Sequence, residues 1–142
     1  MSIKAVLMML FAFAALVPTT SGQAMLSEPP ESIRKYMKEN YPGMVQDVDF
    51  RNEHYRYLKF TDSKNDSRTI LFFLSDRDKC TAIRFIYEKG AKDDVVADLN
   101  SKYKYSGDSR WYFEENRKRA TIELSDEEWF ITVTIKPAEK AN

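Results

Sequence analysis

Thr69-Ile70-Leu71-Phe72-Phe73-Leu74-Ser75 is a stretch of consecutive apolar residues between two polar ends. Neighbouring side chains of a β-strand point to opposite faces of the sheet, so this stretch would place apolar groups on both faces. Such a pattern is typical of a strand in the middle of a sheet. Polar residues on either side, at 62–68 and 76–79, predict turns. We therefore expect a central strand here, with the rest of the sheet built around it.

Further strands are expected on both sides of this stretch. In 54–61, Tyr55 and Tyr57 alternate with Leu58 and Phe60, as in a strand with two different faces. The other segments with strand patterns or positions are 48–51, 80–88, 110–115, 119–124 and 128–136.

Two helices interrupt the strands. Pro30 opens the first, and Pro42 with Gly43 ends it. The second begins at Asp93 or Asp94. Apolar residues recur at helical spacing in both, at Ile33, Tyr36, Met37 and Tyr41 and again at Val95, Val96, Leu99 and Tyr103. The order helix, four strands, helix, three strands predicts an α+β fold, with an antiparallel meander sheet of about six to seven strands and both helices packed on one face.

The N-terminus has the features of an export signal. Lys4 precedes an apolar run from Ala5 to Val17, and small and polar residues follow. About 13 apolar residues are too few to span a bilayer of ~30 Å. Cleavage is expected after Gly22 or after Ala24, and an uncleaved anchor is the alternative. We therefore expect a signal peptide at 1–24, one domain at 25–137, a frayed tail at 138–142, and a periplasmic or secreted product without stable membrane insertion.

The composition of the chain argues against several classes of functional site. The chain has 22 basic and 22 acidic residues, so its charge does not favour nucleic acid. Cys80 is the only cysteine and His54 the only histidine, which leaves no intramolecular disulfide and too few ligands for a zinc site. Cys80 fits the apolar pattern of its strand better than the role of a nucleophile. We expect no metal, no cofactor and no enzymatic activity.

Several polar clusters have a functional interpretation beside a simpler one. Calcium binding, carboxylate catalysis and nucleic-acid binding are possible roles, but solvated turns and hairpin ends explain these residues more simply. The glycosylation sequon has a role only in a protein of eukaryotic source. The clusters are Asp62 with Asn65 and Asp66, Glu114 with Glu115, Asp126 to Glu128, the basic turn Asn116 to Arg119, and the sequon Asn65-Asp66-Ser67.

Aromatic residues on the strands are the best functional signal. A sheet covered by helices on one face leaves its other face open, and exposed aromatic and arginine side chains are typical of protein-binding surfaces. The competing interpretation is that most of the rings form the core. We predict a protein-binding site at Tyr55, Tyr57, Arg84 and Tyr112. The alternative is a small-ligand carrier with a pocket between helices and sheet, lined by Tyr36, Phe72, Leu99 and Trp129.

The segment from Pro30 to Gly43, PESIRKYMKENYPG, followed by Val48 and a strand, resembles the opening of secreted bacterial PepSY-like domains. The arrangement of two helices each followed by strands is similar to the β-lactamase-inhibitory-protein architecture. Residues 62–68 depart from the PepSY pattern, which usually has a glycine-containing turn there. The resemblance implies a small exported module that binds a protein or peptide, including as an inhibitor, and it supplies no catalytic residues.

Overall fold

A computed structural model describes residues 22–47, 50–51, 55–62, 64 and 68–138. The predictions that concern residues 1–21, His54, the sequon at 65–67 and the last four residues of the tail lie outside the described residues.

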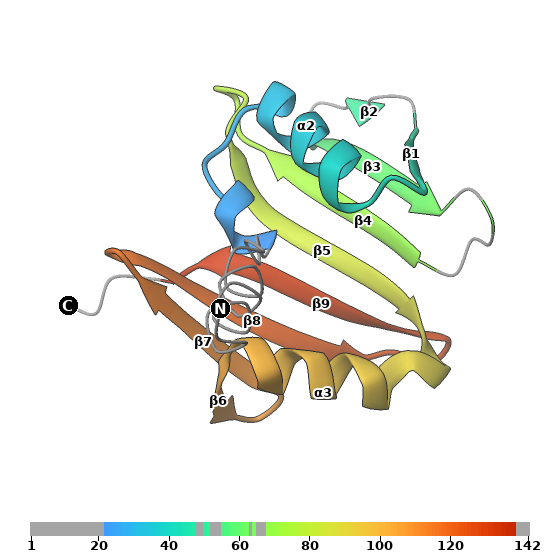
Figure 1. The fold of residues 1–142 in the computed structure, drawn as a ribbon, viewed down its shortest axis with the longest axis vertical. Coiled ribbons are helices and arrows are strands. Elements are labelled where there is room, and N and C mark those ends of the chain that lie inside the picture. Colours follow the sequence, from blue (N-terminus) through green and yellow to red (C-terminus); the bar gives the residue numbers. More distant parts are fainter. Residues whose placement is uncertain (1–21, 48–49, 52–54, 63, 65–67, 139–142) are drawn as a thin grey trace, which may run out of the picture.

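One antiparallel sheet forms the body of the molecule (Figure 1). Its strand order is β1-β3-β4-β5-β9-β8-β7-β6, and β2 pairs with β3 beside this path. The strands are β1 (Met44–Gln46), β2 (Phe50–Arg51), β3 (Arg56–Asp62), β4 (Arg68–Leu74), β5 (Cys80–Glu88), β6 (Lys104–Gly107), β7 (Arg110–Glu115), β8 (Lys118–Asp126) and β9 (Phe130–Pro137). The helical segments are η1 (Gly22–Met25), α2 (Pro30–Asn40), η2 (Lys89–Ala91) and α3 (Lys92–Lys102).

The prediction of an α+β fold with an antiparallel sheet and two α-helices is confirmed. The predicted number of strands and the single meander are wrong. β6 was missed because Lys104-Tyr105-Ser106-Gly107 has no apolar alternation. Of the strand expected at 48–51, the described residues Phe50–Arg51 form β2, and the short strand β1 was not expected.

The strands after α3 do not continue the sheet from β5 in chain order, as a meander would. The chain leaves β5 through α3 and returns at β6 on the far edge, and β6 to β9 then lead back until β9 pairs with β5. Ile83 and Phe85 of β5 lie opposite Ile135 and Val133 of β9 in this pairing, and all four side chains are buried. Pairing two apolar strands at the centre keeps both away from water.

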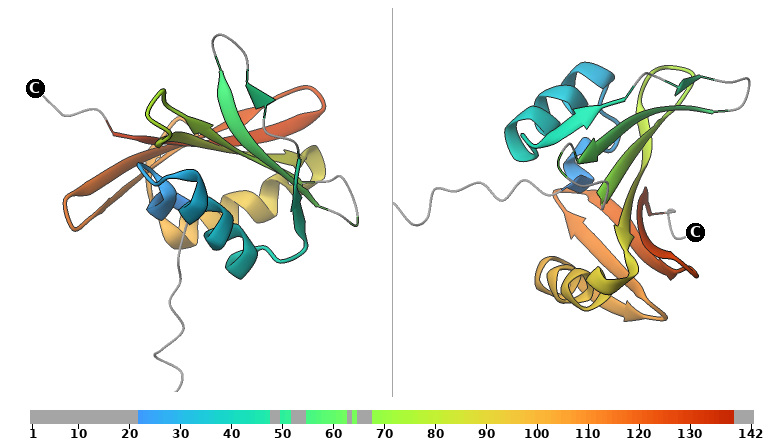
Figure 2. Two further views of the ribbon diagram at one scale, coloured as in Figure 1. Left: turned by 90° about the horizontal axis from the view of Figure 1, so that it is seen from above. Right: turned by 90° about the vertical axis from the view of Figure 1, so that its right-hand side faces the viewer.

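Both α-helices lie on the same side of the sheet (Figure 2). α2 lies over the half that contains β3 to β5, α3 lies beside the half that contains β6 to β9, and η1 lies between the two helices (Figure 1). The helices contribute unequally to packing. α2 buries Ile33, Tyr36 and Met37 in the core, whereas Leu99 is the one buried side chain of α3.

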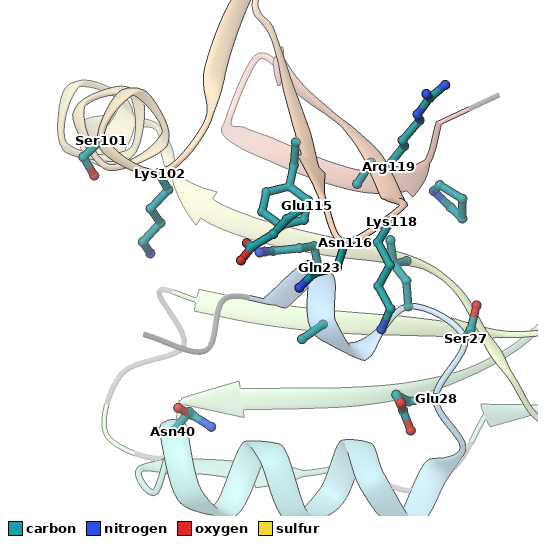
Figure 3. Close-up of a pocket in the computed structure, with 15 residues that line it drawn as sticks. Gln23, Ser27, Glu28, Asn40, Ser101, Lys102, Glu115, Asn116, Lys118 and Arg119 are labelled. Carbon is teal, nitrogen blue, oxygen red and sulfur yellow. The ribbon is translucent and has the colours of Figure 1, made fainter. Parts of the chain in front are cut away.

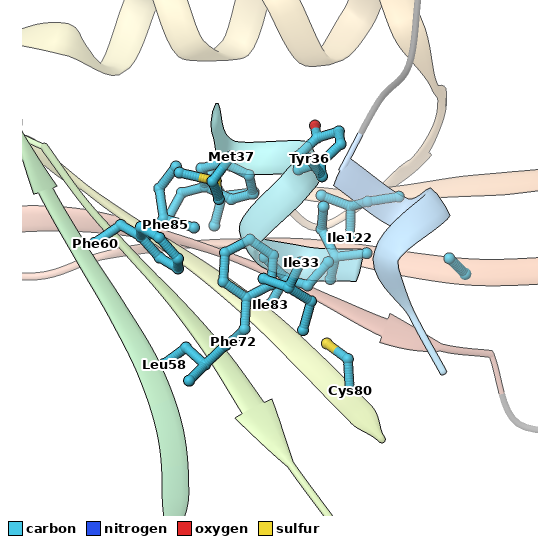
Figure 4. Close-up of a cluster of buried hydrophobic side chains, with 14 of the residues drawn as sticks. Ile33, Tyr36, Met37, Leu58, Phe60, Phe72, Cys80, Ile83, Phe85 and Ile122 are labelled. Atoms are coloured by element: carbon cyan, nitrogen blue, oxygen red, sulfur yellow. The ribbon is translucent and has the colours of Figure 1, made fainter. Parts of the chain in front are cut away.

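The core is continuous across the two halves (Figure 4). It contains Ile33 of α2, Phe72 of β4, Phe85 of β5 and Ile122 of β8, among others. Among the described residues, those whose whole side chain is buried are apolar or aromatic, apart from the Cys80 thiol. The strand residues that belong to this core lie on the face of the sheet that points toward the helices.

The chain around η1 is fixed to the sheet by specific bonds. The Ser27 amide donates to the Cys80 carbonyl at 2.8 Å, and the Cys80 amide donates to the Glu28 carbonyl at 2.9 Å. The Tyr103 hydroxyl hydrogen-bonds to Gln23 Oε1 at 2.7 Å. Gly22 is buried against Phe85, so η1 packs on the sheet.

Candidate binding site

The side of the sheet opposite the helices carries alternate residues of every long strand. Because the core residues point toward the helices, their neighbours along each strand point the other way. The strand register places Tyr57, Phe73 and Ala82 in one row across β3, β4 and β5. Lys59, Leu71, Arg84, Thr134, Glu123 and Arg110 form the next row, across six strands. Neither α-helix covers this open face (Figure 2).

Four side chains of the open face, Tyr57, Phe73, Arg84 and Thr134, form what we name the Phe73 cluster. The rings of Tyr57 and Phe73 meet edge to face, with centroids 5.9 Å apart. The guanidinium carbon of Arg84 lies 5.3 Å from the centre of the Phe73 ring. Arg84 Nε donates to Thr134 Oγ1 at 3.2 Å. All four residues are half-buried, so their side chains are ordered by neighbours yet still accessible from solvent.

A hollow of about 310 Å³ lies beside this cluster. It is bounded by aromatic and basic side chains, and no carboxylate is among the residues that line it: Tyr55, Arg56, Phe73, Leu74, Thr81, Ala82, Arg84 and Lys136. Arg56 forms an ion pair with Asp78. Among the described residues neither Arg84 nor Lys136 takes part in a salt bridge.

The structure brings three of the four predicted site residues together. Tyr55 and Arg84 line the hollow, and Tyr57 adjoins it through Phe73. Tyr112 is on the same face but on β7, three strands from Arg84 in sheet order, or about 14 Å at the usual strand spacing. The Tyr112 hydroxyl hydrogen-bonds to Glu114 Oε2 at 3.2 Å, which ties it to a different part of the surface.

Phe73, Thr134 and Lys136 belong to this region and were missed as site residues. The signal for Phe73 was present, because a strand with apolar residues at successive positions must direct some of them away from the helices. Thr134 and Lys136 carried no signal, since their place beside Arg84 and the hollow depends on the pairing of β5 with β9.

The predicted pocket between helices and sheet does not form from the expected residues. Tyr36, Phe72 and Leu99 are packed in the core, as Figure 4 shows for Tyr36 and Phe72. Trp129 precedes β9 in the β8–β9 connection and is 78% exposed. Its place in the alternation of 128–136 suggested an inward direction, but the strand begins only at Phe130, so Trp129 belongs to the turn.

A different polar group lies on the helix side of the sheet. Arg68 is opposite Tyr87 in the β4–β5 register, and its guanidinium carbon is 5.2 Å from the centre of the Tyr41 ring. Tyr36 and Tyr41 have ring centroids 6.1 Å apart. Burial raises the pKa of Tyr36 and of Tyr87 above the ordinary value, so both phenols stay protonated at neutral pH. Arg68 Nε is buried and has no hydrogen-bond partner among the described residues.

The larger hollow, of about 1080 Å³, lies around η1 and the β7–β8 hairpin (Figure 3). Its polar boundary mixes Lys102, Lys118 and Arg119 with Glu28 and Glu115. Lys102 pairs with Asp98 at 3.0 Å and Arg119 pairs with Glu114 at 3.1 Å. Two of its three cations are therefore neutralised within the protein, and the hollow favours no single ligand chemistry.

The side chains considered for catalysis have structural partners. Burial raises the pKa of the Cys80 thiol to about 12, and Cys80 Sγ lies 3.5 Å from the Ala82 carbonyl oxygen. Asp126 contacts Lys89 at 3.4 Å and Lys92 at 2.8 Å, and these ion pairs hold η2 and α3 to the end of β8. The hydrogen bond from Lys92 lowers the pKa of Asp126.

Within the part of the chain that the structure describes, no three His, Cys, Asp or Glu side chains gather as a metal site requires. In that same part, no helix has the length and hydropathy needed to cross a bilayer.

Comparison with known proteins gave no relative. The chain matches no model of a known protein family, no curated protein and no solved structure.

Proposed function

We propose that the protein is an exported, non-enzymatic binding module whose open sheet face engages a protein or peptide. The observation that carries this proposal is the Phe73 cluster, in which Tyr57 and Arg84 pack on one ring on the face that neither α-helix covers. Phe73 is accessible even though it belongs to one of the most apolar strands of the chain.

The physical properties of the cluster suit binding. Tyrosine, phenylalanine and arginine are enriched at the centres of protein interfaces, where they bury a large area with few rotatable bonds. The contact of Arg84 with Phe73 and its bond to Thr134 restrain the guanidinium before any partner arrives. A side chain ordered in advance loses less conformational entropy on binding, and affinity rises accordingly.

The N-terminal sequence supports export from the cytoplasm. The N-terminal apolar run between Lys4 and the small residues around Gly22 has the form of an export signal, which would deliver the domain to the periplasm or beyond. The resemblance of residues 30–43 to the opening of PepSY-like domains supports a small exported module. Inhibition of an extracytoplasmic enzyme is the form of binding that fits the resemblance to β-lactamase-inhibitory protein.

A capture experiment with face variants tests the proposal. Tagged protein is incubated with the cell-envelope fraction and culture medium of its source, and captured proteins are compared between the wild type and Tyr57→Ala. Trp129→Ala is the matched control, because Trp129 is exposed but lies outside the Phe73 cluster. We expect a partner that Trp129→Ala retains and Tyr57→Ala loses, with both variants folded by circular dichroism. A partner set that is unchanged by Tyr57→Ala would refute the use of this face.

Binding of a small ligand between helices and sheet is a second candidate function. The observation that favours it is Arg68, whose buried Nε lacks a hydrogen-bond partner among the described residues and which lies against the Tyr41 ring and opposite Tyr87. These groups can donate hydrogen bonds to a carboxylate. A thermal-shift titration with acetate and benzoate tests this function, and we expect stabilisation of the wild type and none in Arg68→Gln. Equal responses in the two proteins, or none in either, would remove the candidate.

A further inference from the structure

We infer that the hollow beside Phe73 recognises an acidic side chain, Asp or Glu, in the segment that the open face binds. This inference rests on the proposed function and adds the chemistry of the partner. It starts from the charges around the hollow, which are all positive among the residues that line it.

Two of the three cations have no acidic partner among the residues that the structure describes. Asp78 neutralises Arg56, whereas Arg84 and Lys136 form no salt bridge with any described residue. Arg84 uses Nε to donate to Thr134, and this bond accounts for only one of the five N–H groups of a guanidinium. A carboxylate, the anionic group of polypeptide side chains, matches a guanidinium through two parallel hydrogen bonds.

The surroundings increase the value of such a contact. Arg84 is half-buried and lies against the Phe73 ring, so its charge is less hydrated than that of a fully exposed arginine. A hydrogen bond between charged groups is worth more where water is partly excluded. A basic side chain of a partner would instead meet positive charge, so the same arrangement disfavours basic segments.

The size of the hollow sets the size of what enters it. A volume of about 310 Å³ is at the lower end of the range for small-molecule pockets. It suits a side chain or two of a polypeptide rather than an extended cofactor. The rings of Tyr55 and Phe73 at the boundary provide an apolar contact for a neighbouring residue, so we expect an acidic residue next to an apolar or aromatic one.

Selection from a random linear peptide library displayed on phage tests the inference with the purified protein. We expect enrichment of Asp or Glu at one position beside an apolar residue. In a synthetic copy of the selected peptide, changing that residue to Asn or Gln should weaken binding about tenfold or more in fluorescence polarisation. Arg84→Gln should cause a similar loss, and Arg84→Lys should restore part of it.

Arg119→Gln is the matched control for charge. Arg119 is on the same face, but on β8, and already pairs with Glu114. Its loss should leave the affinity of the peptide and the preference for the acid unchanged.

The outcomes separate the inference from the function on which it rests. Peptides that depend on Tyr57 but show no acidic preference would overturn the inference and leave the proposed function intact. Failure to select any peptide whose binding is reduced by Tyr57→Ala would count against both. An equal loss of affinity in Arg84→Gln and Arg119→Gln would also overturn the inference, because it would indicate a general charge effect.

Discussion

At the scale of single residues, position within a strand decides whether a side chain serves the core or the surface. Phe72 is 1% exposed in the core, and the next residue, Phe73, is half-buried on the open face. The two have the same chemistry, and only the alternation of the strand separates their roles. The same alternation sets Arg84 apart from Ile83 and Phe85 on either side of it, which are buried.

The β7–β8 hairpin contains residues in an unfavourable backbone conformation. Asn116 and Arg117 have φ angles of 51° and 66°, as a two-residue hairpin turn requires. Asparagine tolerates this region well, but arginine does not. We expect Arg117→Gly to raise the free energy of unfolding by about 1 kcal/mol, measured by urea denaturation. Lys118→Gly, in the strand that follows, is the control and should lower it; equal effects of the two changes would contradict the argument.

The buried thiol of Cys80 should be unreactive. Its side chain is 2% exposed, and burial raises its pKa to about 12, so almost no thiolate is present at pH 8 in the folded protein. We expect no reaction with a disulfide reagent such as DTNB in the native state and complete reaction after unfolding in urea. Rapid native labelling of one thiol per chain would show that Cys80 is accessible.

At the scale of elements, the two α-helices differ in what they contribute to stability. Three successive contacts of α2, at Ile33, Tyr36 and Met37, insert into the core, whereas α3 inserts Leu99 and places Val95 and Val96 at half-buried positions. The sequence predicts both helices because each has apolar residues at helical spacing. How deeply each helix is buried depends on the strands beneath it, and helical spacing alone does not contain that information.

This difference predicts unequal mutational costs. Ile33→Ala removes a fully buried side chain and should lower the free energy of unfolding by about 3 kcal/mol. Val96→Ala, on the half-buried face of α3, should cost about 1 kcal/mol or less. Urea denaturation of both variants at one pH measures the two values. Costs of similar size would mean that α3 is held more tightly than its burial indicates.

The segment around η1 distinguishes the two expected cleavage positions. Cleavage after Gly22 keeps Gln23 and its hydrogen bond with Tyr103, and cleavage after Ala24 removes both. We therefore expect the exported chain to begin at Gln23, which intact mass measurement of the secreted or periplasmic protein can determine. A mature chain that begins at Met25 would contradict this expectation.

At the scale of the whole molecule, β5–β9 is the one strand pairing that joins the two halves of the sheet among the described residues, and the two halves share one core. Trp111 of β7 and Phe60 of β3 belong to the same cluster of buried residues although their strands are far apart in the sheet. A shared core favours cooperative unfolding, because neither half can lose its packing without exposing the other.

Cooperative unfolding is testable with a single fluorescent reporter. Trp129 is exposed, so Trp129→Phe should leave the fold intact and make Trp111, which is 2% exposed, the only tryptophan. We expect the urea transitions of Trp111 fluorescence and of far-ultraviolet circular dichroism to coincide. Transitions separated along the urea axis would show that the half containing β6 to β9 unfolds independently.

The sequence by itself determined the elements whose patterns are local. The strands at 80–88 and 110–115 and the start of the first helix at Pro30 follow from alternation, helical spacing and turn residues, which act over a few neighbours. Only the tertiary structure decided that β9 returns to β5, because a choice of partner between distant strands depends on the complete core. That pairing places Thr134 beside Arg84 and Lys136 at the hollow, and it leaves Tyr112 on another part of the face. The residue types of the proposed binding surface could thus be predicted from the chain, but their assembly required the folded sheet.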